Sequence, residues 1–197
     1  MRYPLLVVGL VAVAVFWASG AFARDKASAK SGGKAAVKDG ALKSAMFGAG
    51  CFWGVEETFR TLPGVKETAV GYAGGKTKDP TYKEVCTDKT GHAEVVHIEF
   101  DPAKTSYQKL LDVFFSSHNP MTLNRQGPDV GTQYRSVIFY YSPEQKKLAE
   151  ATIARLTKEK RFPRPIVTAL EPAPPFYMAE DYHQKYLMKR GKNACHY

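Results

Sequence analysis

The sequence contains few cysteines, and they are not arranged as metal ligands. Its 197 residues include three cysteines, and no two of them form a CxxC pair. The histidines are also irregularly spaced. Structural zinc sites need four ligands at short, recurring spacings, so the sequence predicts no metal site, and no bound cofactor is expected. The missing CxxC pair also argues against thioredoxin-like disulfide exchange.

Long apolar runs are absent too. The apolar stretch at residues 5–18 is shorter than a bilayer span and precedes the small-residue site Ala21-Phe22-Ala23. This pattern is typical of a cleaved export signal over residues 1–23, so we expect an exported, periplasmic protein. An uncleaved signal that anchors the chain in the membrane is the alternative.

The odd cysteine count permits either one disulfide plus a remaining thiol, or a reactive thiol with a partner and a third, buried cysteine.

A basic stripe is missing from the folded part of the chain. Residues 24–43 are rich in Lys, Ala, Gly and Ser, which is typical of a flexible basic linker. Roughly half of the net charge of +9 precedes residue 44, so the remaining residues carry only a modest positive charge. The sequence therefore predicts no nucleic-acid binding, and a single catalytic domain over residues 44–197.

The periodicity of apolar residues alternates between strand-like and helix-like patterns. It predicts an α+β fold, a two-layer sandwich with a mixed sheet, a split β-α-β (ferredoxin-like) core and a flexible C-terminal tail. Residues 76–92 and 118–132 are predicted loops. The predicted strands are 44–49, 65–72, 93–100, 134–141 and 166–170, and the predicted helices are 52–62, 106–117, 143–160 and 179–189.

The most informative segment, Gly50-Cys51-Phe52-Trp53-Gly54, lies where the first predicted strand meets the first predicted helix. The unpaired N–H groups at a helix N-terminus favour an anion, so we expect a lowered pKa for the Cys51 thiol and greater nucleophilicity. Phe52 and Trp53 suggest an apolar wall for a small substrate group. A buried packing cysteine is the alternative, but the flanking glycines and aromatics favour a reactive thiol.

Other candidates lie in loops and at strand starts. Glu94 begins a predicted strand, and a desolvated carboxyl there could stay protonated near neutral pH. Tyr82 and Tyr134 could donate phenolic hydrogen bonds. Taken singly, a glutamate such as Glu94 is more often an ordinary exposed residue, and a tyrosine such as Tyr82 or Tyr134 is more often a packing residue with a solvated hydroxyl.

Several separate motifs together resemble the peptide methionine sulfoxide reductase A family and occur in the family order. The resemblance spans residues 44–195. It is specific because it does not depend on one short pattern. The motifs are GCFWG at 50–54, GYAGG at 71–75, PTY at 80–82, GHAE at 91–94, DVGTQYRS at 129–136 and AEDYHQKYL at 179–187.

The resemblance implies reduction of methionine S-sulfoxide to methionine. The Cys51 thiolate would attack the sulfoxide sulfur and become a sulfenic acid as methionine leaves. Glu94 matches the family's acid. Tyr82 and Tyr134 match the tyrosines that donate hydrogen bonds to the sulfoxide oxygen.

The resemblance also implies binding and resolving roles. Phe52 and Trp53 match the residues that hold the S-methyl group, and Asp129 matches a residue on the polar side of the pocket. Cys195 matches the resolving cysteine, whose disulfide with the catalytic thiol would be reduced by thioredoxin or a similar external dithiol. Cys86 matches no catalytic position and is expected to be buried and inert. A monomer that repairs oxidised proteins is expected.

Two other function classes stay open on the residues alone. A thiol peroxidase or disulfide oxidoreductase also needs a cysteine of low pKa at a helix start. An exported binding module would use the aromatics to bind a ligand and would not need the thiol. The sequence does not distinguish between free methionine sulfoxide and oxidised proteins as the main substrate.

Overall fold

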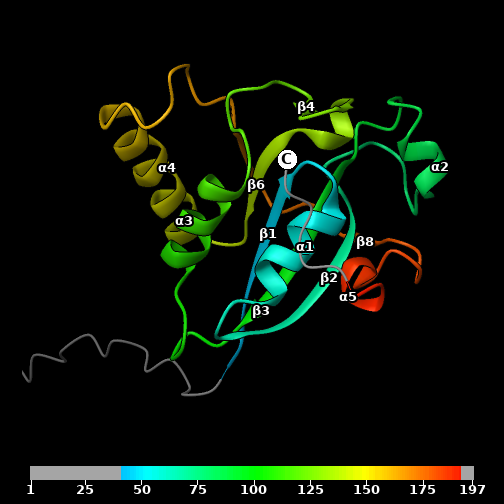
Figure 1. Cartoon of the computed structure of the whole chain (residues 1–197), viewed down its shortest axis with the longest axis horizontal. Helices are drawn as coiled ribbons and strands as arrows, with labels where there is room; N and C mark the ends of the chain where they lie inside the picture. The colour runs from blue at the N-terminus through cyan, green and yellow to red at the C-terminus, as the bar shows by residue number, and fades with distance from the viewer. Residues whose placement is uncertain (1–40, 192–197) are drawn as a thin grey trace, which may run out of the picture. The chain divides into compact units, whose positions relative to one another are not determined.

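The computed structural model describes residues 41–191 of the chain (Figure 1). The predicted export signal, nearly all of the predicted linker and Cys195 lie outside the described residues. Over residues 41–191, the helices are too short or too polar to cross a membrane.

A six-stranded sheet forms the centre of the fold, in the order β7-β6-β1-β3-β2-β8. β6 and β7 run parallel, and the other neighbouring pairs run antiparallel. The inner order β6-β1-β3-β2, with helix α1 linking β1 to β2, is the predicted split β-α-β arrangement. The strands are β1 (Lys43–Ala49), β2 (Val65–Ala73), β3 (Ala93–Phe100), β6 (Ser136–Tyr140), β7 (Ala169–Pro172) and β8 (Tyr177–Met178).

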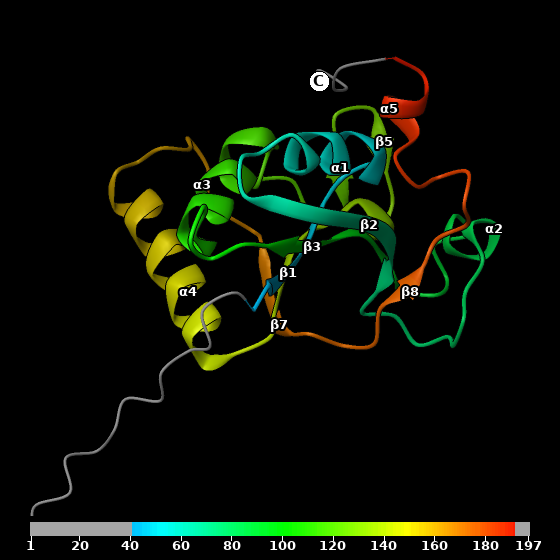
Figure 2. The same cartoon turned by 90° about the horizontal axis from the view of Figure 1, so that it is seen from below.

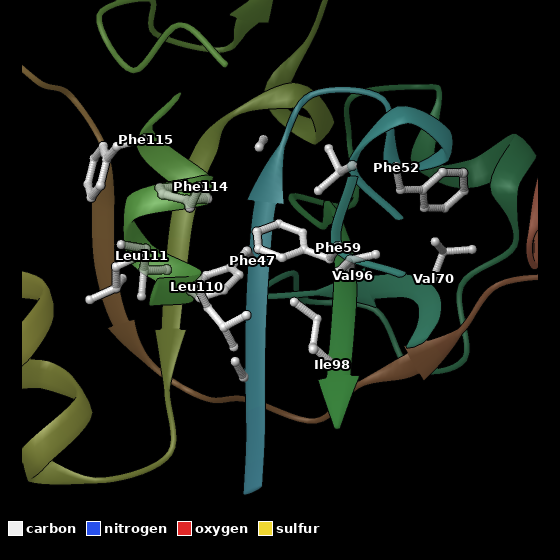
Figure 3. Packing of buried hydrophobic residues seen from close by; sticks show 14 of the residues in the cluster. Phe47, Phe52, Phe59, Val70, Val96, Ile98, Leu110, Leu111, Phe114 and Phe115 are labelled. Atoms are coloured by element: carbon white, nitrogen blue, oxygen red, sulfur yellow. The ribbon is translucent and has the colours of Figure 1, made fainter. Parts of the chain in front are cut away.

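Helices cover one face of this sheet (Figure 2). The helices concerned are α1 (Phe52–Arg60), α3 (Tyr107–Ser117) and α4 (Pro143–Lys158). In the core, the Phe47 ring of β1 lies 5.4 Å from Phe59 of α1 and 5.1 Å from Phe114 of α3 (Figure 3). Each such buried ring contributes about 1.5–3 kcal/mol relative to an exposed one. The predicted α+β fold with a mixed sheet is confirmed.

The opposite face of the sheet carries a smaller apolar cluster. Met46, Val95 and Phe139 are fully buried there, and Phe176 packs against them. Because both faces are covered, the inner strands β1, β3 and β6 are almost continuously buried, as in the segment from Ala45 to Ala49. The buried sheet is therefore a rigid support for residues at its edges.

The starts of two helices follow the expected capping chemistry. The Ser106 hydroxyl accepts a hydrogen bond from the Lys109 N–H at 3.2 Å, and α3 begins at the next residue. The Ser142 hydroxyl accepts from the Gln145 N–H at 3.3 Å, and Pro143 is the first residue of α4. The predictions of these two helices are confirmed.

The predicted helix at 179–189 is largely wrong. Only α5 (Tyr186–Lys189) is helical, and residues 181–185 form turns that end at Lys185, with a left-handed φ of 53°. The Gln184 side chain accepts from the Val70 N–H and donates to the Val70 carbonyl, both at 2.9 Å. The segment is therefore held by bonds to β2 instead of by its own helical ladder.

The two predicted loops contain short elements that the sequence analysis did not identify. The first contains α2 (Tyr82–Val85), whose start is fixed by a capping box between Thr81 and Glu84. The second contains a small hairpin of β4 (Arg125–Gln126) and β5 (Asp129–Val130), followed by the 3₁₀ turn η1 (Thr132–Tyr134). These elements carry three of the predicted site residues.

Candidate active site

Cys51 lies at the junction of β1 and α1 and occupies the N-cap position of the helix. It is half-buried. The preceding Gly50 has φ +95°, and a side chain there would lie 2.6 Å from Gln126 Cγ. Glycine therefore permits both the turn and the close approach of the β4 strand. The structure confirms the predicted location of the thiol at a helix N-terminus.

Glu94 brings a carboxyl to the same helix N-terminus. The Phe52 N–H donates to Glu94 Oε2 at 3.0 Å, which joins β3 to the residue after Cys51. The Glu94 residue is 2% exposed. Burial raises its pKa to about 8, and the nearby Asp129 charge acts in the same direction, although the Phe52 hydrogen bond opposes them. The carboxyl is therefore mainly protonated at neutral pH, and Oε1 is available to carry the proton.

Tyr82 and Tyr134, from the two loop regions, each interact electrostatically with this carboxyl. Burial raises the pKa of Tyr134, and the charges of Glu94, Asp129 and Cys51 raise it further. Burial likewise raises the pKa of Tyr82, with contributions from a hydrogen bond with Cys86 and from Glu94. Both hydroxyls stay protonated and can donate hydrogen bonds.

Cys86 is exposed, so the prediction that it is buried is wrong. It ends α2 one turn after Tyr82, with its backbone N–H donating to the Tyr82 carbonyl at 2.9 Å. A short surface helix leaves its C-terminal residue facing solvent, which the apolar character of cysteine did not indicate. Desolvation raises the pKa of the Cys86 thiol, the hydrogen bond with Tyr82 opposes this effect, and the Glu94 and Glu180 charges add to it. The thiol form therefore prevails at neutral pH.

The aromatic pair after Cys51 forms an apolar wall that other rings extend. Phe52 is 1% exposed, whereas Trp53 is half-buried. The Trp53 ring stacks on Tyr186 of α5 with centroids 3.7 Å apart, and its Nε1–H donates to His183 Nδ1 at 2.9 Å. The His183 ring also lies 5.0 Å from Phe52. The stacking on Tyr186 and the hydrogen bond to His183 thus hold the indole in place.

His183 and Glu180 are site residues that the sequence analysis missed. Because His183 Nδ1 accepts the indole proton, its own proton lies on Nε2, and burial lowers the pKa of the ring so that it stays neutral. Glu180 accepts from the Tyr82 N–H and from the Tyr72 hydroxyl, each at 2.9 Å. Both residues belong to the motif at 179–187, which was the signal that could have identified them.

A cleft of about 410 Å³ opens beside the thiol. It lies between α1, the end of α3 and the β4 hairpin, and its lining is mainly polar. Phe52, Trp53 and Glu94 do not line it, so Cys51 lies between this cleft and the aromatic wall. The lining includes Cys51, Thr58, Ser117, His118, Asn119 and Gln126.

The structure places most of the predicted site residues around the start of α1. Asp129, on β5, is half-buried and acts electrostatically on Glu94 and Tyr134. Cys195 lies outside the described residues. In the part of the chain that the structure describes, no group of three or more His, Cys, Asp or Glu side chains is placed to hold a metal ion. The arrangement brings together a thiol at a helix N-terminus, a protonated carboxyl, two phenolic hydroxyls and an apolar wall.

Comparison with known proteins gives a consistent result. Residues 43–197 match the model of the family described as peptide methionine sulfoxide reductase. The MsrA protein of Acidobacterium capsulatum is 63% identical over 155 residues, which cover 79% of this chain and 99% of that protein. The reduced form of Mxr1 from Saccharomyces cerevisiae is 38% identical with a TM-score of 0.72, covering 79% of this chain and 91% of the yeast chain. Mxr1 in complex with Trx2 is 26% identical with a TM-score of 0.51, and the match covers 74% of this chain and 84% of the yeast chain.

Proposed function

The chain belongs to the peptide methionine sulfoxide reductase family and is an enzyme that reduces methionine sulfoxide, and we propose that it acts on the S epimer through a sulfenic acid on Cys51. The substrate would be methionine S-sulfoxide, either free or in oxidised proteins, and the outcome would be protein repair. No bound cofactor takes part in this scheme, because the electrons come from thiols.

The observation that carries the proposal is the hydrogen bond from the Phe52 N–H to Glu94. It holds a buried carboxyl of raised pKa next to the residue that supplies the nucleophile. A thiolate at a helix N-terminus and a neutral acid beside it are the two groups that sulfoxide reduction needs. In the proposed pair the sulfur would carry the negative charge, and the carboxyl would carry the transferable proton.

The reductive step follows from this pairing. The Cys51 sulfur attacks the sulfoxide sulfur while Glu94 transfers its proton to the sulfoxide oxygen. Tyr82 and Tyr134 donate hydrogen bonds to the same oxygen as negative charge develops on it. The S–S bond of the resulting adduct and the original S–O bond then break as the protonated oxygen bonds to the cysteine sulfur. Cys51 becomes a sulfenic acid, oxidised by two electrons, and the reduced substrate leaves as methionine.

Epimer selectivity would come from the two unlike walls of the site. A methyl group is best held by aromatic faces, and Phe52 with the stacked Trp53 supplies them. The oxygen must then point toward Glu94 and the tyrosines, with Asp129 on that polar side. One arrangement of methyl, oxygen and chain around the sulfur satisfies both walls, and its mirror image does not.

Turnover requires removal of the sulfenic acid. We assign this to Cys195, which would form a disulfide with Cys51 and release water. A thioredoxin-like dithiol would then reduce the disulfide, as the complex of the related Mxr1 with Trx2 supports. A Cys195→Ser variant should form about one methionine per enzyme and then stall with thioredoxin. Finding a 51–86 disulfide after one turnover of the parent would contradict this assignment.

The location of the enzyme is a further part of the proposal. Residues 1–23 have the pattern of an export signal, so the mature protein would begin at Arg24 in an oxidising compartment. It would then depend on a dedicated source of reducing equivalents. Sequencing the N-terminus of protein from the fractionated native cell tests this. Cytoplasmic enzyme with an intact N-terminus would overturn it.

The function itself is tested by a dithiol-coupled assay on each sulfoxide epimer, free and within a short peptide. Methionine should form from the S epimer and not from the R epimer. Equal rates on both epimers would contradict the two-wall arrangement.

A further inference from the structure

We propose that Glu180 is a positioning residue that fixes Tyr82 in the catalytic site. The inference rests on the proposed function, in which the Tyr82 hydroxyl donates to the sulfoxide oxygen. Glu180 Oε1 accepts from the Tyr82 N–H and Glu180 Oε2 accepts from the Tyr72 hydroxyl, both at 2.9 Å. One carboxylate therefore binds a catalytic loop and a sheet strand at the same time.

Tyr82 depends on this contact because its own helix is short. α2 has four residues, and its capping box with Thr81 and Glu84 is purely local. The bond to Glu180 joins residues 98 positions apart in the sequence and ties the first turn of α2 to the rest of the fold. Asp88, just after α2, accepts from the Thr132 N–H at 2.7 Å, which holds the other end of the loop. Removing the Glu180 carboxylate would remove the hydrogen bond that ties the Tyr82 backbone to the rest of the fold, and would leave the local cap and the contact of the Tyr82 ring with His183, whose centroids are 4.6 Å apart.

The same carboxylate also reaches the apolar wall. Tyr72 is fully buried, and its ring lies 5.9 Å from the Phe52 ring. His183 Nε2 lies 3.9 Å from Glu180 Oε2, while the other nitrogen of His183 holds the Trp53 indole. Glu180 thus connects the side chain that donates to oxygen with the side chains that hold the methyl group.

Glu180 is suited to this role because it is ionised. Burial alone would raise its pKa, but the hydrogen bonds from the Tyr82 N–H, from its own backbone and from the Tyr72 hydroxyl together outweigh that effect and hold the pKa below its ordinary value. Both oxygens therefore accept hydrogen bonds at neutral pH. Charged acceptors form stronger hydrogen bonds than neutral ones, so the contact is well suited to hold the short helix α2 in place.

The test is a double-mutant cycle on the single-turnover rate of methionine formation. Glu180→Ala should lower the rate about tenfold in the parent, because misplacing a donor weakens stabilisation of the developing charge, but by less than about twofold when Tyr82 is already Phe. Gln184→Ala is the matched control. It loosens the same chain segment at Val70 without contacting Tyr82. Its effect should be the same factor in both backgrounds.

A second measurement separates positioning from general loosening. Exchange of the Tyr82 amide proton, followed by NMR, should accelerate in Glu180→Ala and not in Gln184→Ala. Glu180→Gln keeps one oxygen for the Tyr82 N–H, so it should retain amide protection and a rate within a few-fold of the parent. This variant also covers the case in which the alanine variant does not fold.

Equal effects of Glu180→Ala in the two backgrounds, or unchanged exchange of the Tyr82 amide, would overturn the proposal. A Tyr82→Phe variant that keeps the parental rate would overturn it as well. In both cases the parent would still form methionine, whereas failure of the proposed function would leave the parent without that activity.

Discussion

Glu94 is the residue whose chemistry depends most on its surroundings. An exposed glutamate is ionised at neutral pH and can only accept hydrogen bonds. Burial at the start of β3 raises its pKa to about 8, while the Phe52 N–H occupies one oxygen and leaves the other for the proton. The Asp129 charge contributes to the raised pKa. Burial thus gives a common acidic residue a proton that it can donate at neutral pH.

The cysteines differ in a way that can be tested directly. Cys51→Ser should abolish single-turnover formation of methionine, because serine is not a nucleophile in this setting without an activating base. Cys86→Ser should leave the rate within a few-fold, because the Cys86 thiol has a raised pKa and ends a surface helix. The measurement is methionine produced per enzyme without added reductant. Substantial methionine from the Cys51 variant would refute the mechanism.

The short segment at 179–187 determines the shape of the apolar wall although it has little regular structure. Three side chains fasten it, namely Glu180 to α2, Gln184 to β2, and Glu56, whose carboxylate accepts from the Lys185 N–H at 2.7 Å. These bonds place His183 against Trp53. The segment is therefore a structural part of the site as well as a link to the C-terminus.

Gln184→Ala should show the importance of this fastening. The variant loses two hydrogen bonds to Val70 and one to the Ala179 carbonyl, which we expect to cost about 1–3 kcal/mol of unfolding free energy. It should also slow methionine formation, because the Trp53 side of the site is loosened. Denaturant unfolding and single-turnover rates measure the two effects.

Ser142→Ala provides the control for that prediction. It removes the N-cap of α4, a helix that carries none of the proposed site residues, and should cost about 1 kcal/mol. The single-turnover rate of methionine formation by Ser142→Ala should equal that of the parent. If both variants lose stability and neither loses activity, the segment at 179–187 does not shape the site.

The elements that the sequence predicted are those with strong local signals. Alternating apolar residues indicated β3, and serine caps indicated α3 and α4. The turns at 181–185 could not be predicted, because the bonds that replace the helix come from Val70 and Glu56, more than a hundred residues away. For the same reason the motifs identified Cys51 and Glu94 but gave no role for Glu180 or His183. The residues that contact Glu180 and His183 are distant in the sequence, so these contacts can be identified only in the folded structure.

At the scale of the whole molecule, the raised pKa of Glu94 should make the free energy of unfolding depend on pH. Its pKa is about 8 when folded and near 4.5 when unfolded, so between these pH values the folded chain holds a proton that the unfolded chain releases. Stability from this group therefore falls as pH rises from about 4.5 to 8. The Glu94→Gln variant lacks this loss of stability, because glutamine does not titrate. Relative to the parent, this variant should gain unfolding free energy as pH increases, on the order of a few kcal/mol at pH 8.

Other titrating groups do not obscure this comparison. Burial lowers the pKa of His118 to about 4, which makes stability rise with pH over an overlapping range. His118 is present in both proteins, so its contribution cancels in the difference. Parallel stability curves for parent and Glu94→Gln between pH 5 and 8 would show that Glu94 does not have a raised pKa.

The most direct test of the account is the pH dependence of the single-turnover rate for the parent and for Glu94→Gln. In the parent, the rate should fall as pH rises through about 8, because Glu94 loses the proton that it must transfer. Glutamine keeps the shape but has no proton to transfer, so the variant should be about 10²–10⁴-fold slower and lack this decline. A variant rate within a few-fold of the parent across neutral pH, with the same decline above pH 8, would contradict the assignment of Glu94 as the acid.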